Sequence, residues 1–333
     1  MTTSTRAVAV ALSVDVAIAS AKAAAAFVTG STAILAELVH SLADIVNQLL
    51  LVVGIVRSER VPDREFPYGF GRSRYVWALL SASGVLFVGS GVTIVRGAQQ
   101  LWEPEPLEHL GWGFVILLVS LAAESVSLGV GFSSVRKAAR RTGQSVWGYL
   151  GGGPDPMGVA VVLEDASAVV GVGLALAGIA LTRWTGNPAW DGAASIAIGA
   201  LLGATAVFLI DRNRRFLLGP APPPEAIERM VAVLEEDPII ERIRDVKVSQ
   251  LGAEEVRFKA EIAFNGRELA RQLVASKNLD EAWSKLESPD DLERLLTDFG
   301  AEVTDAVGDA VDRIEERLAE AVPEARHVDL EPD

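Results

Sequence analysis

The stretch ELVHSLADIVNQ, residues 37–48, places four polar side chains inside a segment that is otherwise apolar. On a helix that turns about 100° per residue, Glu37, His40, Asp44 and Asn47 fall within one narrow stripe. His40 and Asp44 are four residues apart, so an imidazole and a carboxylate point to the same place, and both groups are ligands of divalent metals. A polar seam that bonds neighbouring helices is the alternative, but four such residues on one stripe favour a cation site.

A cation site needs ligands from more than one helix, and two other apolar segments carry acidic residues. The segment MGVAVVLEDASAVVGVG contains Glu164 and Asp165, which are adjacent and therefore point about 100° apart. At most one of them can squarely face the spot that His40 and Asp44 face. Glu124 follows Ser120 and precedes Ser127 on one helix face, which is typical of the wall of a wet cavity.

The elements that must position these residues are predicted to cross a membrane. Half of the 333 residues are hydrophobic, and the mean hydropathy is positive. A span needs about 20 mostly apolar residues. Six segments qualify, at about 8–28, 34–56, 75–101, 110–134, 157–182 and 190–210. The first also carries Asp15 and Lys22, two turns apart, which either neutralise each other or belong to a polar interior.

The basic residues predict how these spans are oriented. Clusters of Lys and Arg follow the second, fourth and sixth spans, whereas the other connections are poor in positive charge. By the positive-inside rule, both termini are expected in the cytoplasm. The sequence has no transit-like leader rich in Arg and Ser, so the expected location is the plasma (inner) membrane.

The charge divides the chain into two parts. Residues 1–215 hold 16 Lys and Arg against 15 Asp and Glu, a net of +1, and the remainder holds 14 against 29, a net of −15. An acidic surface of this kind disfavours nucleic-acid binding. The prediction is a transmembrane domain at 1–215, a Pro-rich linker at 216–224 and a soluble domain at 225–333. Alternating strands and amphipathic helices in the order αββ(α)αβ indicate a small α+β domain, with an insertion at 265–298.

Two stretches together resemble a known family of transporters. TGSTAILAELVHSLADIVNQLLLVVG, followed by FPYGFGRSRYVWAL, is similar to the cation diffusion facilitator family, and the final HVDLEP extends the resemblance over nearly the whole chain. The start of the predicted fifth span is similar to the branch that includes the animal mitochondrial zinc exporter. The resemblance implies six spans, a cytoplasmic ferredoxin-like domain, a homodimer, and export of Zn²⁺ or a related divalent ion in exchange for protons.

The family pattern can be carried over to only some positions of this chain. His40 and Asp44 match the ligand pair in the second span, and Asp165 matches the aspartate of the fifth span, but Val161 stands where that family has a histidine. Glu164, Asn47 or water is then expected to supply a fourth ligand, with Glu37 and Glu124 as further pathway candidates. Losing one imidazole favours harder oxygen ligands, so Mn²⁺, Fe²⁺ and Co²⁺ join Zn²⁺ as candidate cargo.

The soluble domain offers one weaker candidate. His327, Asp329 and Glu331 alternate along the predicted final strand and so share a face. With one imidazole among them, an acidic exposed edge is favoured over a metal site.

These residues define a hypothesis and its alternatives. The chain is expected to be a secondary transporter without a prosthetic group, because no nucleotide-binding motif occurs in a workable context. A metal-dependent hydrolase inside the membrane, or a membrane scaffold or sensor that does not transport, remain the alternatives.

Overall fold

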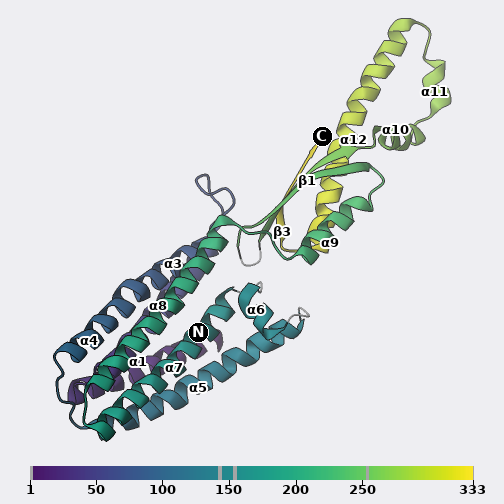
Figure 1. Ribbon diagram of the computed structural model, residues 1–333. Coiled ribbons are helices and arrows are strands. Elements are labelled where there is room, and N and C mark those ends of the chain that lie inside the picture. The colour runs from purple at the N-terminus through teal and green to yellow at the C-terminus, as the bar shows by residue number, and fades with distance from the viewer. Residues whose placement is uncertain (1–2, 142–144, 153–155, 253–254, 333) are drawn as a thin grey trace. The chain divides into compact units, whose positions relative to one another are not determined.

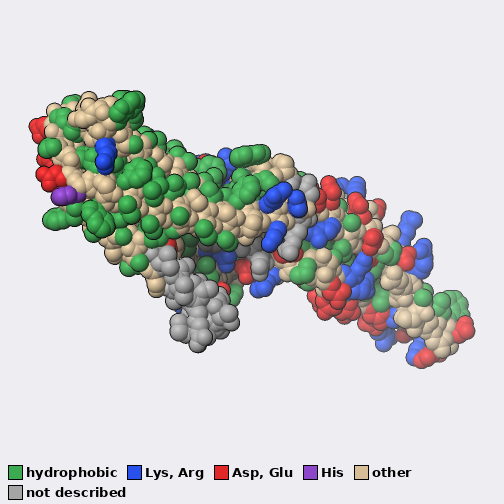
Figure 2. Space-filling view, turned by 90° about the horizontal axis from the view of Figure 1, so that it is seen from below, with side chains coloured by type: hydrophobic (Ala, Val, Ile, Leu, Met, Phe, Trp, Pro, Cys, Tyr) green, Lys and Arg blue, Asp and Glu red, His purple; other side chains and the backbone are tan. Residues whose placement is uncertain are grey.

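A computed structural model of the chain describes residues 3–141, 145–152, 156–252 and 255–332. The chain divides into two compact units, Met1–Leu218 and Gly219–Asp333. The first is all-helical and the second contains a small sheet (Figure 1). On the face shown in Figure 2, hydrophobic side chains dominate the helical unit, whereas acidic and basic side chains gather on the other unit.

Long helices build the first unit. They are α1 (Thr3–Thr29), α2 (Thr32–Ser58), α3 (Ser73–Gly84) with η1 (Val85–Ser90) and α4 (Gly91–Trp102), α5 (Leu110–Arg141), α7 (Pro156–Thr185) and α8 (Ala189–Leu218). Each predicted span lies within one of these helical stretches. A short helix that the sequence did not predict, α6 (Val146–Gly152), joins α5 to α7, and its Tyr149 packs with Val135 and Val159.

Five of the described helices are long and apolar enough to cross a membrane: α2, the α3–η1–α4 stretch, α5, α7 and α8. The 27-residue α1 is not among them, although it packs against α2 and α5. The protein is therefore a membrane protein with several apolar helices, and a sixth crossing by α1 stays a prediction.

Small residues let α4 and α8 pack backbone against backbone. A Cβ atom at Gly97 would lie 2.8 Å from the carbonyl oxygen of Gly192, and one at Gly199 would lie 3.1 Å from the amide nitrogen of Ile94. Ser90 in the π-helical turn donates a 2.7 Å hydrogen bond to the carbonyl of Gly199. Close approach of this kind replaces the hydrophobic driving force that is missing between helices in lipid.

One buried carboxylate ties the start of α8 to the start of α2. Asp191 has no exposed surface, and its Oδ2 accepts hydrogen bonds from the backbone nitrogen of Thr32 at 2.6 Å and from its hydroxyl at 2.8 Å. Oδ1 accepts one from the Ser31 hydroxyl, and Ser31 itself caps α2. The free amides and the dipole at a helix N-terminus favour such an anion. This contact holds the end of the helix that carries His40 and Asp44.

The second unit is a two-layer domain. Strands β1 (Ile240–Gln250), β2 (Val256–Phe264) and β3 (Ala325–Pro332) form a sheet in the order β1-β2-β3, antiparallel and then parallel. Helices α9 (Pro224–Glu235) and α12 (Pro289–Ala321) pack on it, with Phe258, Ile262 and Ile314 fully buried. The order of elements matches the predicted αββ(α)αβ pattern. A ferredoxin-like classification stays a prediction.

The predicted insertion differs from the structure at its end. Residues 265–298 contain α10 (Gly266–Ala275), α11 (Leu279–Ser284) and the first turns of α12, which runs unbroken instead of starting near residue 301. The reason is a capping box: the Ser288 hydroxyl accepts from the Asp291 amide, and the Asp291 side chain accepts from the Ser288 amide. Pro289 follows the cap residue Ser288 and favours the first helical position. The long helix therefore begins at residue 289, twelve residues before the predicted position.

We predict that Asp191→Asn lowers the free energy of unfolding by about 2 kcal/mol or more, because buried hydrogen bonds to a charged acceptor are lost. Thermal or denaturant unfolding of the purified protein in detergent measures this. Asp211→Asn on the same helix is the matched control, since its carboxylate is 45% exposed and, among the described residues, pairs with Arg214 and Arg215. That change should leave the free energy of unfolding close to that of the wild type, because an exposed ion pair contributes little to stability. Equal stability of the two variants would contradict the role given to Asp191.

Candidate metal centre

The polar stripe of α2 divides into a buried part and a part that faces a cavity. His40 is 4% exposed, and its Nε2 lies 3.5 Å from Oδ2 of Asp44. Neither ring nitrogen of His40 has a hydrogen-bond partner among the described residues. A buried imidazole normally satisfies its nitrogens. A buried imidazole without a hydrogen bond, next to a carboxylate, is an arrangement from which a metal ligand pair can form.

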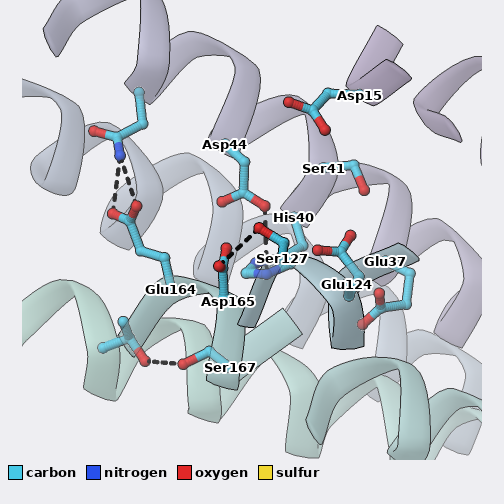
Figure 3. A network of polar contacts seen from close by, with 12 residues as sticks. Asp15, Glu37, His40, Ser41, Asp44, Glu124, Ser127, Glu164, Asp165 and Ser167 are labelled. Atoms are coloured by element: carbon cyan, nitrogen blue, oxygen red, sulfur yellow. Dashed lines mark hydrogen bonds and ion pairs between the residues drawn. The ribbon is translucent and has the colours of Figure 1, made fainter. Parts of the chain in front are cut away.

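A cavity of about 340 Å³ adjoins this pair, and carboxylates from four helices line it. They are Asp15 of α1, Asp44 of α2, Glu124 of α5, and Glu164 and Asp165 of α7. In Figure 3 the side chains of Asp44, Asp165 and Ser127 point into common space beside His40. Five carboxylates around one cavity within an apolar bundle repel each other unless cations or protons are present.

The adjacent acidic residues of α7 have different partners. Asp165 accepts a 2.8 Å hydrogen bond from the Ser127 hydroxyl of α5, whereas both oxygens of Glu164 accept from Nδ2 of Asn47 at 2.9 Å (Figure 3). Because they diverge on the helix, Asp165 lies on the His40 side of the cavity and Glu164 lies beside Asn47. Asp165 is therefore the better placed of the two to share an ion with His40 and Asp44.

Val161, one turn before Asp165, also lines the cavity and is 42% exposed. The position at which the sequence resemblance leads one to expect a fourth ligand thus faces the same space as Asp44 and Asp165. Its isopropyl group cannot ligate. The donors around the cavity are therefore mostly oxygen atoms.

The described residues contain no group of three or more His, Asp or Glu side chains close enough to hold a metal ion as they stand. His40 and Asp44 are together on α2, but Asp165 is bonded to Ser127. A site that uses all three requires Asp165 to move closer to the His40–Asp44 pair.

Glu37, a candidate pathway residue, lies outside the cavity. Its Oε2 is 3.2 Å from Nζ of Lys22, and neither side chain has any exposed surface. The same ammonium donates to the Ser41 hydroxyl at 2.8 Å and lies 3.9 Å from Oε1 of Glu124. Lys22 thus neutralises Glu37, not Asp15. Asp15 instead accepts a hydrogen bond from Gln48 across the cavity wall.

Sequence reasoning overlooked Ser41 and Gln48, which both line the cavity. The signal was available, because Glu37, Ser41, Asp44 and Gln48 follow the 4-3-4 spacing of one helix face. Of the neutral polar residues on this helix, Asn47 was among the predicted candidates, but Ser41 and Gln48 were not.

The candidates on β3 have other partners. Oδ2 of Asp329 accepts from Nε and a terminal nitrogen of Arg257 at 3.0 and 2.7 Å, and Glu331 pairs with Lys259 at 2.7 Å. Arg257 lies opposite His327 in the parallel register of β2 and β3, and Lys259 lies opposite Asp329. The two carboxylates therefore form an ion-pair ladder with β2.

A third carboxyl group near β3 has a raised pKa. Burial raises the pKa of Glu315 on α12, and repulsion from the carboxylates of Asp312 and Asp329 raises this pKa further. Asp329 and Glu331 on the final strand are balanced by the basic residues of β2 that pair with them. The preference for an acidic edge over a metal site on this strand stays a prediction.

The chain was compared with known proteins. The family described as "Cation efflux transmembrane domain" matches residues 8–218. The chain is 39% identical over 306 residues to the human protein named "Proton-coupled zinc antiporter SLC30A9, mitochondrial". This alignment covers 91% of this chain and 54% of the relative. It is 39% identical over 312 residues to "Metal tolerance protein C4" of Arabidopsis thaliana, covering 92% of this chain and 68% of the relative.

A bacterial relative aligns over a shorter stretch. "Cation-efflux pump FieF" of Klebsiella pneumoniae is 36% identical over 96 residues, which is 28% of this chain and 31% of the relative. The chain spans about half the length of the animal relatives that it matches. The match of the family to nearly the entire helical unit shows what kind of protein this is: the chain belongs to the cation efflux family of membrane transporters.

Proposed function

We propose that the protein is a secondary transporter that exports a divalent cation in exchange for protons, and that His40, Asp44 and Asp165 hold the ion during transport. One observation carries this proposal: a cavity lined by carboxylates from four helices adjoins a buried His–Asp pair. The names of the animal relatives, which are proton-coupled zinc antiporters, support it.

The chemistry of the ligands explains the coupling. A dication needs anionic ligands to enter a bundle surrounded by about 30 Å of hydrocarbon. His binds a metal only when its ring is neutral, and Asp only when it is ionised, so protons and metal compete for the same atoms. A proton gradient can therefore displace the ion on the acidic side, without ATP.

The cavity position agrees with uptake of the ion from the cytoplasm. Ser41, Asn47 and Leu51 line it, and they lead from His40 towards the basic connection after α2, which the positive-inside rule assigns to the cytoplasm. In this proposal both termini are cytoplasmic and the membrane is the bacterial-type inner membrane. Rocking of α7 and α5 relative to α2 would bring Asp165 to the His40–Asp44 pair and close this entrance.

Zn²⁺ is the first candidate for the cargo, because it combines imidazole and carboxylate ligands in four-coordinate sites. Val161 leaves one imidazole in the set, and oxygen-rich sites also suit Mn²⁺, Fe²⁺ or Co²⁺. We further propose that the protein works as a homodimer, as the family resemblance implies.

We predict that Asp165→Asn, His40→Ala and Asp44→Asn each lower metal-driven proton flux in proteoliposomes by about 100-fold, because each loses one ligand of the ion. The flux is measured with a pH-sensitive dye and a panel of divalent ions. Asp211→Asn, which lies outside the cavity, should retain wild-type flux. Full activity of Asp165→Asn would contradict a site shared by α2 and α7.

Val161→His should raise the preference for Zn²⁺ over Mn²⁺ by about tenfold, since an added imidazole is a softer ligand than water or carboxylate. The ratio of kcat/KM for the two ions in the same flux assay measures this preference. Val170→His is the matched control, because Val170 lies on the same helix, is 52% exposed and does not line the cavity. An unchanged ratio in Val161→His would show that position 161 does not reach the ion.

A further inference from the structure

Lys22 is a lysine buried directly behind the cavity wall. Its side chain has no exposed surface, and its three partners come from two other helices. Two of those partners, Ser41 and Glu124, line the cavity, whereas Glu37 does not. The ammonium is therefore shared between a carboxylate that belongs to the interior and one that an entering ion can reach.

The two carboxylates hold Lys22 unequally. Glu37 is 3.2 Å away and wedged in place, since a Cβ atom at Gly171 would lie 2.5 Å from its Oε1. Glu124 is 3.9 Å away, and its side chain is 18% exposed to the cavity. Glu37 and the Ser41 hydroxyl thus anchor the ammonium, and Glu124 is the partner that can turn towards the cavity.

We propose that Lys22 lowers the affinity of the cavity for cations by competing with the entering ion for Glu124. This inference rests on the proposed function, because it takes the cavity to be the ion's path. An ammonium that pairs with Glu124 offsets part of the attraction of the cavity for a dication. The ion then binds weakly enough to leave, which a transporter requires and a storage site does not.

The proposal predicts opposite shifts for two neutralising changes. In Lys22→Gln/Glu37→Gln the internal ion pair is removed as a unit and Glu124 loses its competitor, so KM for Zn²⁺ should fall about tenfold or more, with a lower maximal rate. In Glu37→Gln the ammonium keeps Glu124 as its one anionic partner among the described ion pairs, so KM should rise several-fold. Lys22 with a purely structural role predicts wild-type KM in both proteins.

The experiment measures initial Zn²⁺ flux in proteoliposomes and, independently, Zn²⁺ binding to the detergent-purified proteins by isothermal titration. Lys285→Gln is the matched control, because it removes the same charge from an exposed pair with Glu281 in the second unit. Its KM should equal that of the wild type. A wild-type KM in the double variant, or shifts of the same sign in both variants, would overturn the inference.

A second comparison decides the matter if the double variant does not fold. Glu37→Gln should raise KM for Zn²⁺ in the wild-type background. In a Glu124→Gln background it should leave KM unchanged, because Lys22 no longer competes with the ion for a cavity carboxylate. Equal shifts in both backgrounds would also overturn the inference. If the wild type itself moves no divalent ion, the proposed function fails, whereas flux with unaltered KM in every variant rejects the role of Lys22 alone.

Discussion

The ion pair between Lys22 and Glu37 is the interaction on which the arrangement of the helical unit around the cavity depends. Removing two charges from water costs several kcal/mol for each ion unless they meet in good geometry with further hydrogen bonds. Here the pair joins α1 to α2, Ser41 completes it, and Glu124 links it to α5. The cavity is consequently built against a wall whose own charges are already compensated.

The remaining polar residues follow from this constraint. Because Lys22 neutralises Glu37, the carboxylates of Asp15, Asp44 and Asp165 have no buried Lys or Arg beside them among the described ion pairs. They are held by neutral groups, as in the hydrogen bonds from Gln48 to Asp15 and from Ser127 to Asp165. Excess negative charge in an apolar bundle is costly. A bound dication would compensate this negative charge.

The sequence predicted the helices well because membrane spans leave a strong signal. Long apolar runs located the long helices of the described part of the first unit. The short helix α6 was missed because its seven residues are too few for such a signal. In the second unit the polar stretch before residue 301 concealed the early start of α12. The start depends on a local cap at Ser288, which composition does not report.

The site could be predicted only in part. Spacing on one helix put His40 beside Asp44, but it could not show which helix supplies Lys22 with a partner, because that depends on how α1 packs against α2. Asp15, seven residues away on the same helix, was as reasonable a partner as Glu37. The choice between Glu164 and Asp165 likewise depended on contacts with Asn47 and Ser127, which lie on other helices.

The central claim is that His40 binds the transported ion together with carboxylates. The chain has no Cys and three His residues, so replacing His109 and His327 leaves His40 as the only imidazole. X-ray absorption at the zinc edge of that variant, loaded with one Zn²⁺, measures the ligands directly. We expect one imidazole nitrogen at about 2.0 Å in a shell otherwise made of oxygen. A shell of oxygen atoms alone would contradict the account.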